Sequence, residues 1–240
     1  MASISHRLSI HFSPSNPSTK PTETTSTLVL TSPTGLFVDM RIPLPLPSPS
    51  ATLHPLPPDM WAFAGCTYRD APVANGSWAC AWSHAIDTLH APGAPRPKDE
   101  GTMFPLLKNR TREVGAMENP DTGRVEEYEE MWEDEELVDV GDGIECAVAR
   151  WWTGEGWDGE REMKDRLGLV VRVGKWAQGI VRDGEGVWVE RWEWADGGWR
   201  AVWRGGSGDG KVGVVDVIKL EERGVVEGRD WIVAERIAIE

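Results

Sequence analysis

Apolar and polar residues alternate with a period of two across residues 167–194, the pattern of half-buried β-strands. Glycines at position 174 and within residues 183–186 interrupt the alternation and suit tight turns. The apolar positions are rich in valine and tryptophan, which favour a pleated surface with one buried face. This stretch therefore predicts consecutive antiparallel hairpins.

The same alternation recurs along the rest of the chain. Residues 27–31 and 36–41 flank a turn sequence at 32–35, and residues 112–116 and 125–132 flank another at 119–123, so each pair predicts a hairpin. Further strands are predicted at residues 4–12, 61–65, 78–82, 146–152, 199–203, 212–218 and 231–239. No stretch sustains the apolar spacing of a helix of normal length, so the chain is predicted to be all-β, with short helical segments at most.

Composition divides the chain in two. All 17 prolines lie at or before Pro120, whereas 20 of the 26 glycines and 11 of the 14 tryptophans follow it. We therefore predict two domains, residues 1–132 and 144–240, the first carrying a proline-rich loop at 42–59. Prolines remove backbone donors, so this loop cannot be a central strand, and its alternative role is a polyproline ligand for a partner module.

A formal net charge of -14 disfavours binding to nucleic acid or to an anionic membrane. The acidic run at residues 126–136 either docks a basic partner or is a solvated strand end and connection. The chain shows no apolar run long enough to span a bilayer and no signal-peptide core, so we expect an intracellular protein. Its three cysteines lack metal-ligand spacing and are expected to be reduced thiols.

Catalytic patterns are weak throughout. All five histidines precede residue 91, and His84 and Asp87, although close to Ser83, lack the context of a catalytic triad. The GxGxxG match at residues 154–159 lacks the strand and helix of a nucleotide site and is interpreted as a turn. We therefore predict no catalytic residues, no metal site and no cofactor, and a protein that is not an enzyme.

Five short motifs carry a family resemblance through their order and spacing. They are WAFAG at 61–65, AIDT at 85–88, EVGA at 113–116, EEMW at 129–132 and GKWAQG at 174–179. In this order the chain resembles the fungal family of casein-kinase-interacting proteins with two lipocalin-like domains. The resemblance implies two tandem lipocalin-like (calycin) antiparallel β-barrels, a location in the cytoplasm and also the nucleus, a casein kinase I-type partner and no assigned enzymatic activity.

Tryptophans and their neighbours are the candidate interior of such barrels. The speculative ligand-contacting residues are Trp61, Phe63, Trp82, Trp176, Gln178, Trp188 and Trp192. Trp176, in a G-x-W element similar to that of lipocalin first strands, is predicted to plug the second barrel. We predict a non-enzymatic intracellular interaction protein. The alternative is a small-molecule carrier or barrel enzyme with an aromatic-lined pocket, whose ligand the sequence leaves unknown.

Overall fold

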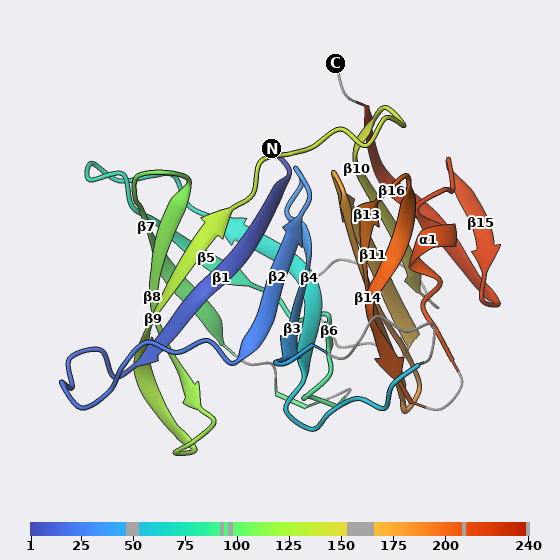
Figure 1. The fold of residues 1–240 in the computed structure, drawn as a ribbon. Helices are drawn as coiled ribbons and strands as arrows, with labels where there is room; N and C mark the ends of the chain where they lie inside the picture. Colours follow the sequence, from blue (N-terminus) through green and yellow to red (C-terminus); the bar gives the residue numbers. More distant parts are fainter. Residues whose placement is uncertain (47–52, 92–93, 96–97, 153–165, 208–209, 239–240) are drawn as a thin grey trace.

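The protein consists of two antiparallel β-sheets that lie side by side (Figure 1). The structure is a computed structural model that describes residues 1–46, 53–91, 94–95, 98–152, 166–207 and 210–238. Within these ranges the chain forms sixteen strands and one helix of four residues, so the predicted all-β fold class is confirmed. The described part contains no helix long and apolar enough to cross a membrane.

The first sheet is a closed barrel. Eight strands form its ring in the order β3-β2-β1-β9-β8-β7-β5-β4, a pairing between β3 and β4 closes it, and the short β6 pairs with β4. Its strands are β1 (Ser3–Phe12), β2 (Thr25–Thr31), β3 (Leu36–Pro43), β4 (Trp61–Arg69), β5 (Trp78–Trp82), β6 (Ile86–Asp87), β7 (Asp99–Pro105), β8 (Arg110–Asn119) and β9 (Arg124–Asp134).

The second sheet has seven strands in the order β14-β13-β12-β11-β10-β16-β15. They are β10 (Ile144–Trp152), β11 (Arg166–Val173), β12 (Trp176–Asp183), β13 (Gly186–Ala195), β14 (Gly198–Gly206), β15 (Arg223–Val226) and β16 (Arg229–Ala238). Among the described residues the edge strands β14 and β15 do not pair with each other, so this second β-unit does not close into a ring as the first does. Its apolar face is covered by the barrel instead.

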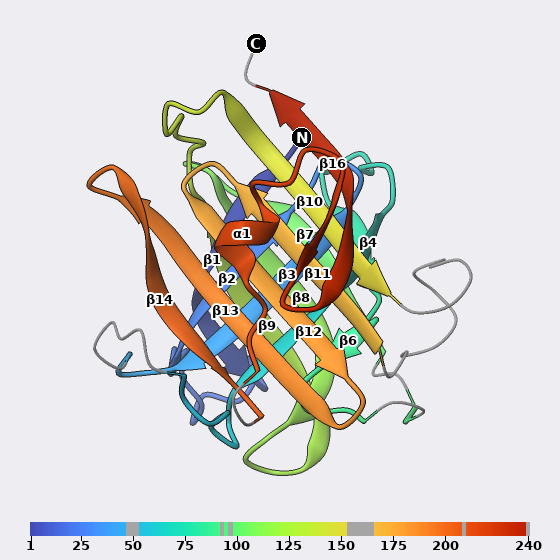
Figure 2. The same cartoon turned by 90° about the vertical axis from the view of Figure 1, so that its right-hand side faces the viewer.

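A single hydrophobic core joins the two sheets. The barrel contributes the outward-facing residues of β1–β4, including Ile4 and Val38, and the second sheet contributes Val148 and Val171, all of them buried in one cluster. Figure 2 shows the second sheet lying across the barrel. Independent folding of residues 1–132 and 144–240 remains a prediction, and a shared core argues against it.

Covering the outside of the barrel reverses the usual placement of apolar and polar residues. On β3, Val38 and Met40 point outward into the shared core, whereas Asp39 and Arg41 line the interior. Side chains alternate between the two faces of a strand, so an apolar outer face leaves the inner face free to be polar. The barrel interior can therefore hold charged groups without exposing an apolar surface to water.

Polar side chains of the second sheet, among them Gln178 and Arg191, reach across this core to backbone carbonyls of the barrel. Gln178 Nε2 donates to the carbonyls of Leu28 and Val38 at 3.0 Å each, and Gln178 Oε1 accepts from Arg191 Nε at 2.7 Å. Arg191 also donates to the carbonyl of Met40. Burial lowers the pKa of Arg191 to about 9, against the opposing influence of Asp39. The sequence proposed Gln178 as a ligand-contacting residue, but its hydrogen bonds connect the two sheets instead.

The far face of the second sheet packs against the helix α1 (Val214–Val217), and the sheet's own strands β15 and β16 contribute Val226 and Trp231 to the same buried cluster (Figure 2). The sequence predicted a strand at residues 212–218, and this prediction is wrong. Val214, Val217 and Ile218 are all buried, the i, i+3, i+4 spacing of one helix face, but a single turn is too short for that period to stand out. The close approach of this segment depends on Gly179, where a Cβ would lie 2.7 Å from Val214.

The proline-rich loop packs against the second sheet where it is described. His54 forms an isolated parallel bridge with Gly205 of β14, and its ring stacks on Trp203 with centroids 6.4 Å apart. Residues 47–52 of the predicted loop lie outside the described residues, as does the GxGxxG match at residues 154–159. The chain itself joins the loop to β3 and β4, and the bridge attaches it to β14 as well.

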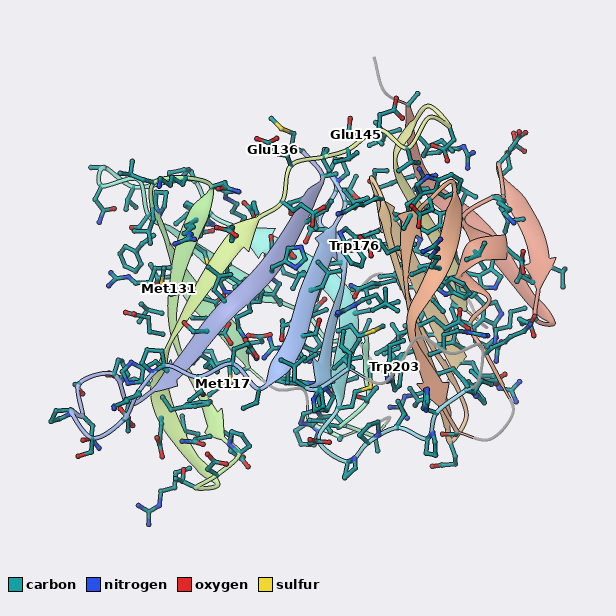
Figure 3. The ribbon with its side chains drawn as sticks, in the orientation of Figure 1. Met117, Met131, Glu136, Glu145, Trp176 and Trp203 are labelled. Carbon is teal, nitrogen blue, oxygen red and sulfur yellow. The ribbon has the colours of Figure 1, made fainter. Side chains whose placement is uncertain are left out.

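Trp176 lies between the two sheets, and its predicted place inside a second barrel is corrected. Figure 3 shows Trp176 and Trp203 in the layer between barrel and second sheet. Trp176 Nε1 donates to Glu135 Oε2 at 3.1 Å, and the same carboxylate contacts His6 at 2.8 Å and Lys175 at 3.2 Å. Burial would raise the pKa of Glu135, but hydrogen bonds from His6, Trp176 and Lys175 lower it below its ordinary value.

Trp176→Ala should lower the free energy of unfolding by about 2 kcal/mol, because the indole is only partly buried and its removal leaves a gap that solvent can partly fill. Trp176→Phe should cost less than about 1 kcal/mol, since Glu135 keeps its contacts with His6 and Lys175. Denaturant midpoints of both variants check this. A loss above about 4 kcal/mol for Trp176→Ala would instead indicate a fully enclosed plug.

A candidate ligand cavity in the first barrel

A cavity of about 600 Å³ occupies the interior of the first barrel. Ligand sites in proteins commonly measure roughly 300–1,000 Å³. Inward-facing side chains from all eight strands of the ring line it, together with the β2–β3 turn and the N-terminus. Its aromatic lining residues are Phe37, Phe63, Trp78, Trp82, Tyr128 and Trp132, and its charged ones are Asp39, Arg41, Arg69, Asp99, Glu113, Glu130 and Asp134. The cavity is therefore both aromatic and strongly polar.

Arg41 is the central cation of the interior. Its Nε and Nη2 donate to Asp39 Oδ2 at 3.1 and 2.9 Å, and its Nη1 lies 3.9 Å from Glu130 Oε1. The guanidinium also stacks over Trp61 and Phe63, 4.5 and 5.2 Å from the ring centroids. Burial would lower the pKa of Arg41, but Asp39 and Glu130 raise it further than burial lowers it. Arg41 is thus a permanent charge whose Nε and Nη2 donors are engaged by Asp39.

Glu113 faces Glu130 directly across β8 and β9. Glu113 is 4% exposed and Glu130 is 1% exposed, so two carboxyl groups share one wall of the cavity. Tyr128 donates from its hydroxyl to Glu113 Oε1 at 2.6 Å, and Trp132 Nε1 donates to Oε2 at 2.9 Å. Burial first, and then repulsion from Glu130, raise the pKa of Glu113 to about 8 despite the hydrogen bond from Tyr128. Glu113 is therefore mainly protonated at neutral pH.

The parent protein should become less stable as pH rises because of Glu113, and Glu113→Gln should not show this loss. The folded pKa lies above the unfolded one, so the folded state holds a proton that the unfolded state releases. The contribution of Glu113 is full below the unfolded pKa near 4.5 and is lost as pH rises through about 8. One pKa unit corresponds to about 1.4 kcal/mol, so the stability difference between variant and parent should shift by a few kcal/mol in favour of the variant.

Urea unfolding of both proteins at several pH values between these limits measures the effect. Glu126→Gln is the matched control, because Glu126 on β9 has its carboxylate at the surface, where hydrogen bonds from Thr122, Asn119 and Ser13 lower the pKa. That variant should not gain stability relative to the parent with rising pH. Parallel pH profiles for the parent and Glu113→Gln would show that Glu113 is ionised in the folded protein.

A buried histidine between two aspartates flanks the cavity. His84 Nδ1 lies 2.6 Å from Asp87 Oδ2 and its Nε2 lies 2.9 Å from Asp99 Oδ2, while Phe63 stacks on the ring at 4.0 Å. Burial lowers the pKa of His84, but its hydrogen bonds to Asp87 and Asp99 raise it above the ordinary value. The hydroxyl of Ser83 instead contacts the backbone of Cys66 at 2.9 Å. His84 therefore balances the charge of the two carboxylates and does not reach this serine.

One carboxylate oxygen at the cavity wall has no hydrogen-bond partner among the described residues. Asp39 is 3% exposed, and its Oδ2 takes both hydrogen bonds from Arg41, which leaves Oδ1 unpartnered. Thr67 Oγ1, in the same lining, is also buried without a described partner. A buried acceptor that lacks a donor costs free energy, and a hydrogen-bond donor that enters the cavity would remove this cost.

The structure separates the residues that the sequence proposed as a ligand site. Phe63 and Trp82 line the cavity, and Trp61 lies beside them against Arg41. Trp176 and Gln178 lie between the sheets, and Trp188 and Trp192 pack on the far face of the second sheet, so the structure places these four outside any barrel interior.

Sequence reasoning missed the charged half of the site. Arg41, Glu113, Tyr128 and Glu130 line the cavity or its wall, and the alternation of their strands does not say whether these positions face water or a buried interior. Their only signal is that Tyr128, Glu130 and Trp132 share one parity of β9, mixing aromatic and acidic residues on one face. Among the described residues, no group of three or more histidine, cysteine, aspartate or glutamate side chains is placed to hold a metal ion.

Comparisons with known proteins give a family and a fold. The model of the family described as Protein HRI1 matches residues 3–235. Among solved structures, the crystal structure of the uncharacterized protein YLR301w from Saccharomyces cerevisiae is similar, with a TM-score of 0.71 and 23% sequence identity over 99% of this chain and 100% of that chain. At this identity the likeness shows the fold alone. A search of curated proteins found no match.

Proposed function

This chain belongs to the HRI1 protein family, and we propose that it is a non-enzymatic binding protein that holds a small organic molecule inside its first barrel. The observation that carries the proposal is the cavity of about 600 Å³, closed by a ring of eight strands and walled by aromatic rings and buried charges. Convergent polar groups in a preformed cavity of this size are what a specific ligand site requires. A barrel filled by its own side chains would need neither the space nor the charges.

The reactive groups near the cavity favour binding over catalysis. Cys80 lines the cavity, but burial raises the pKa of its thiol to about 11, so it is a poor nucleophile at neutral pH. Both ring nitrogens of His84 are engaged by aspartates, which leaves neither for a substrate. A general base must reach its proton directly or through one water. The raised pKa of Cys80 and the engagement of His84 therefore support the binding of a ligand over catalysis.

Filling the cavity tests the proposal. The uncharged fluorophore N-phenyl-1-naphthylamine should bind the parent protein saturably, and Met117→Trp should weaken this binding by about tenfold or more, because Met117 points into the cavity. Met131→Trp is the matched control: Met131 lies on the neighbouring strand β9, is half-buried like Met117 and alternates with the inward-facing Glu130 and Trp132 (Figure 3). Equal fluorescence from all three proteins would place the dye elsewhere and overturn the proposed site.

Interaction with a casein kinase I-type kinase is a second, separate proposal. It is supported by the family resemblance of the sequence and by the acidic β8–β9 hairpin, which projects from the barrel and exposes Glu118, Asp121 and Glu127 (Figure 1). A basic surface on the kinase, met in the cytoplasm or nucleus, would be its counterpart. Replacing these three acids by Gln or Asn should weaken binding to the purified kinase in a salt-dependent manner. Unchanged binding would exclude the hairpin as the docking surface.

A further inference from the structure

We propose that the cavity selects an organic cation, a protonated amine or quaternary ammonium on an aromatic or aliphatic body, and holds its charged group against Asp39, Glu113 and Glu130. This inference rests on the proposed function, because it names the ligand class of the same cavity. It is drawn from the balance of charge in the lining, from the unpartnered Asp39 oxygen and from the aromatic walls.

Carboxylates outnumber cations in the cavity lining. Among the described lining residues, five carry a carboxyl group and two carry a guanidinium group. Arg41 is held by Asp39 and covered by Trp61 and Phe63, and Arg69 lies over the Trp78 ring at 3.9 Å. An anionic ligand would have to compete with Asp39 for the Nε and Nη2 donors of Arg41. A cationic ligand would meet an excess of acceptors.

The acidic wall is a contiguous arrangement. Asp39 joins Arg41, Arg41 approaches Glu130, and Glu130 faces Glu113 on the next strand. Glu113 holds a proton near neutral pH, and Glu130 is already paired with Arg7, whose Nη1 donates to Glu130 Oε1 at 2.6 Å. A bound cation would stabilise the ionised form of Glu113 and provide a donor for Asp39 Oδ1. Two independent features of one wall, the facing glutamates and the unpartnered oxygen, thus indicate the same chemistry.

Aromatic side chains suit the rest of such a ligand. Phe37, Trp78, Trp82 and Trp132 line the cavity, and cations are attracted to the faces of aromatic rings as well as to carboxylates. An organic body would bury its apolar surface against these rings while its charge stays at the acidic wall. A small inorganic ion would leave most of the cavity unfilled, so the volume favours an organic cation.

Binding should be coupled to release of a proton. The groups that face Glu113 are Glu130, Tyr128 and Trp132 of β9, Asp99 of β7 and Arg41 of β3. A cation beside Glu113 stabilises its ionised form, so the affinity should rise as pH increases towards about 8. An uncharged ligand gains nothing from this change.

Three probes with the same body and different charge test the inference on the full-length protein. They are 4-phenylbutylamine, 4-phenylbutan-1-ol and 4-phenylbutyrate, each used to displace N-phenyl-1-naphthylamine. The amine should displace the dye at about tenfold lower concentration than the carboxylate and at lower concentration than the alcohol. Its affinity should rise several-fold from about pH 6 to about pH 8.5, while that of the alcohol stays level.

Two variants assign the effect to the acidic wall. Glu113→Gln should make the amine affinity nearly independent of pH, and Asp39→Asn should weaken the amine about tenfold with little change for the alcohol. If Asp39→Asn fails to fold, the probe series on the parent and on Glu113→Gln still decides the matter. A carboxylate that binds as well as the amine overturns the inference. The inference is also overturned if the dye binds in the cavity, as shown by its dependence on Met117, but the amine does not displace it. In that case the proposed function still stands. Failure of the dye itself to bind overturns both.

Discussion

Residues 144–240 expressed alone should show no cooperative unfolding transition. One face of the second sheet, with Val148, Leu169, Val171, Val173 and Ile180 at its centre, is buried only because the barrel covers it. Ten side chains of this region belong to the shared core: Cys146, Val148, Leu167, Leu169, Val171, Val173, Ile180, Val187, Val189 and Trp203. At about 1.5 kcal/mol or more for each buried apolar side chain, the cost of their exposure reaches at least the upper end of the roughly 5–15 kcal/mol that stabilises a typical domain.

Fragment complementation provides the control for this experiment. Residues 1–143 co-expressed with 144–240 should form a complex that unfolds as one unit, because the pieces regain the shared core and the carbonyl contacts of Gln178 and Arg191. Circular dichroism during urea unfolding compares the separate pieces with the mixture. A cooperative transition of residues 144–240 alone, with a midpoint near that of the full chain, would instead support two independent domains.

Glu190→Ala should destabilise the protein by on the order of 3–5 kcal/mol, the largest effect that we expect from a single polar substitution. Glu190 is 1% exposed and lies beside the chain where α1 begins. Its carboxylate accepts from the backbone N–H groups of Val212, Gly213 and Val214 at 3.0 to 3.3 Å, and from Trp192 Nε1 at 2.9 Å. In Glu190→Ala all four of these N–H donors lose the carboxylate that accepts their hydrogen bonds.

Glu193→Ala is the matched control for Glu190→Ala, because Glu193 lies on the same strand but is partly exposed and contacts Lys175 at 3.4 Å. Exposed ion pairs contribute little, so its loss should cost less than about 1 kcal/mol. Glu190→Gln should give an intermediate value, since the amide keeps one acceptor and loses the charge. Thermal unfolding of the three variants checks this order. Equal midpoints for Glu190→Ala and Glu193→Ala would show that the amides find other acceptors.

Most strands were predictable from the sequence because their signal is local. The alternation over residues 167–194 became β11, β12 and β13, and the turn residues around Gly174 and 183–186 lie between them. The failures include two short elements. β15 has four residues and α1 occupies one turn, so neither repeats its period often enough to be recognised.

The candidate site was predictable only in part. Phe63 and Trp82 could be proposed from the aromatic composition of their strands, and both line the cavity. The charged residues could not, because an acidic residue in an alternating strand has the same local pattern whether it faces water or a buried interior. Four of the seven proposed residues lie elsewhere for the same reason: periodicity groups side chains by face and does not say what covers the face.

By itself, the sequence determined that the chain forms antiparallel strands, where most of them begin and end, and which residues share a face. These properties depend on backbone sterics and side-chain alternation within a few residues. Tertiary structure alone decided which face is inside. Because the second sheet packs on the outside of β1–β4, Val38 and Met40 are buried there, and Asp39 and Arg41 meet Glu113 and Glu130 inside the barrel. Burial is a property of the assembled sheets, so the charged cavity exists only once both have folded together.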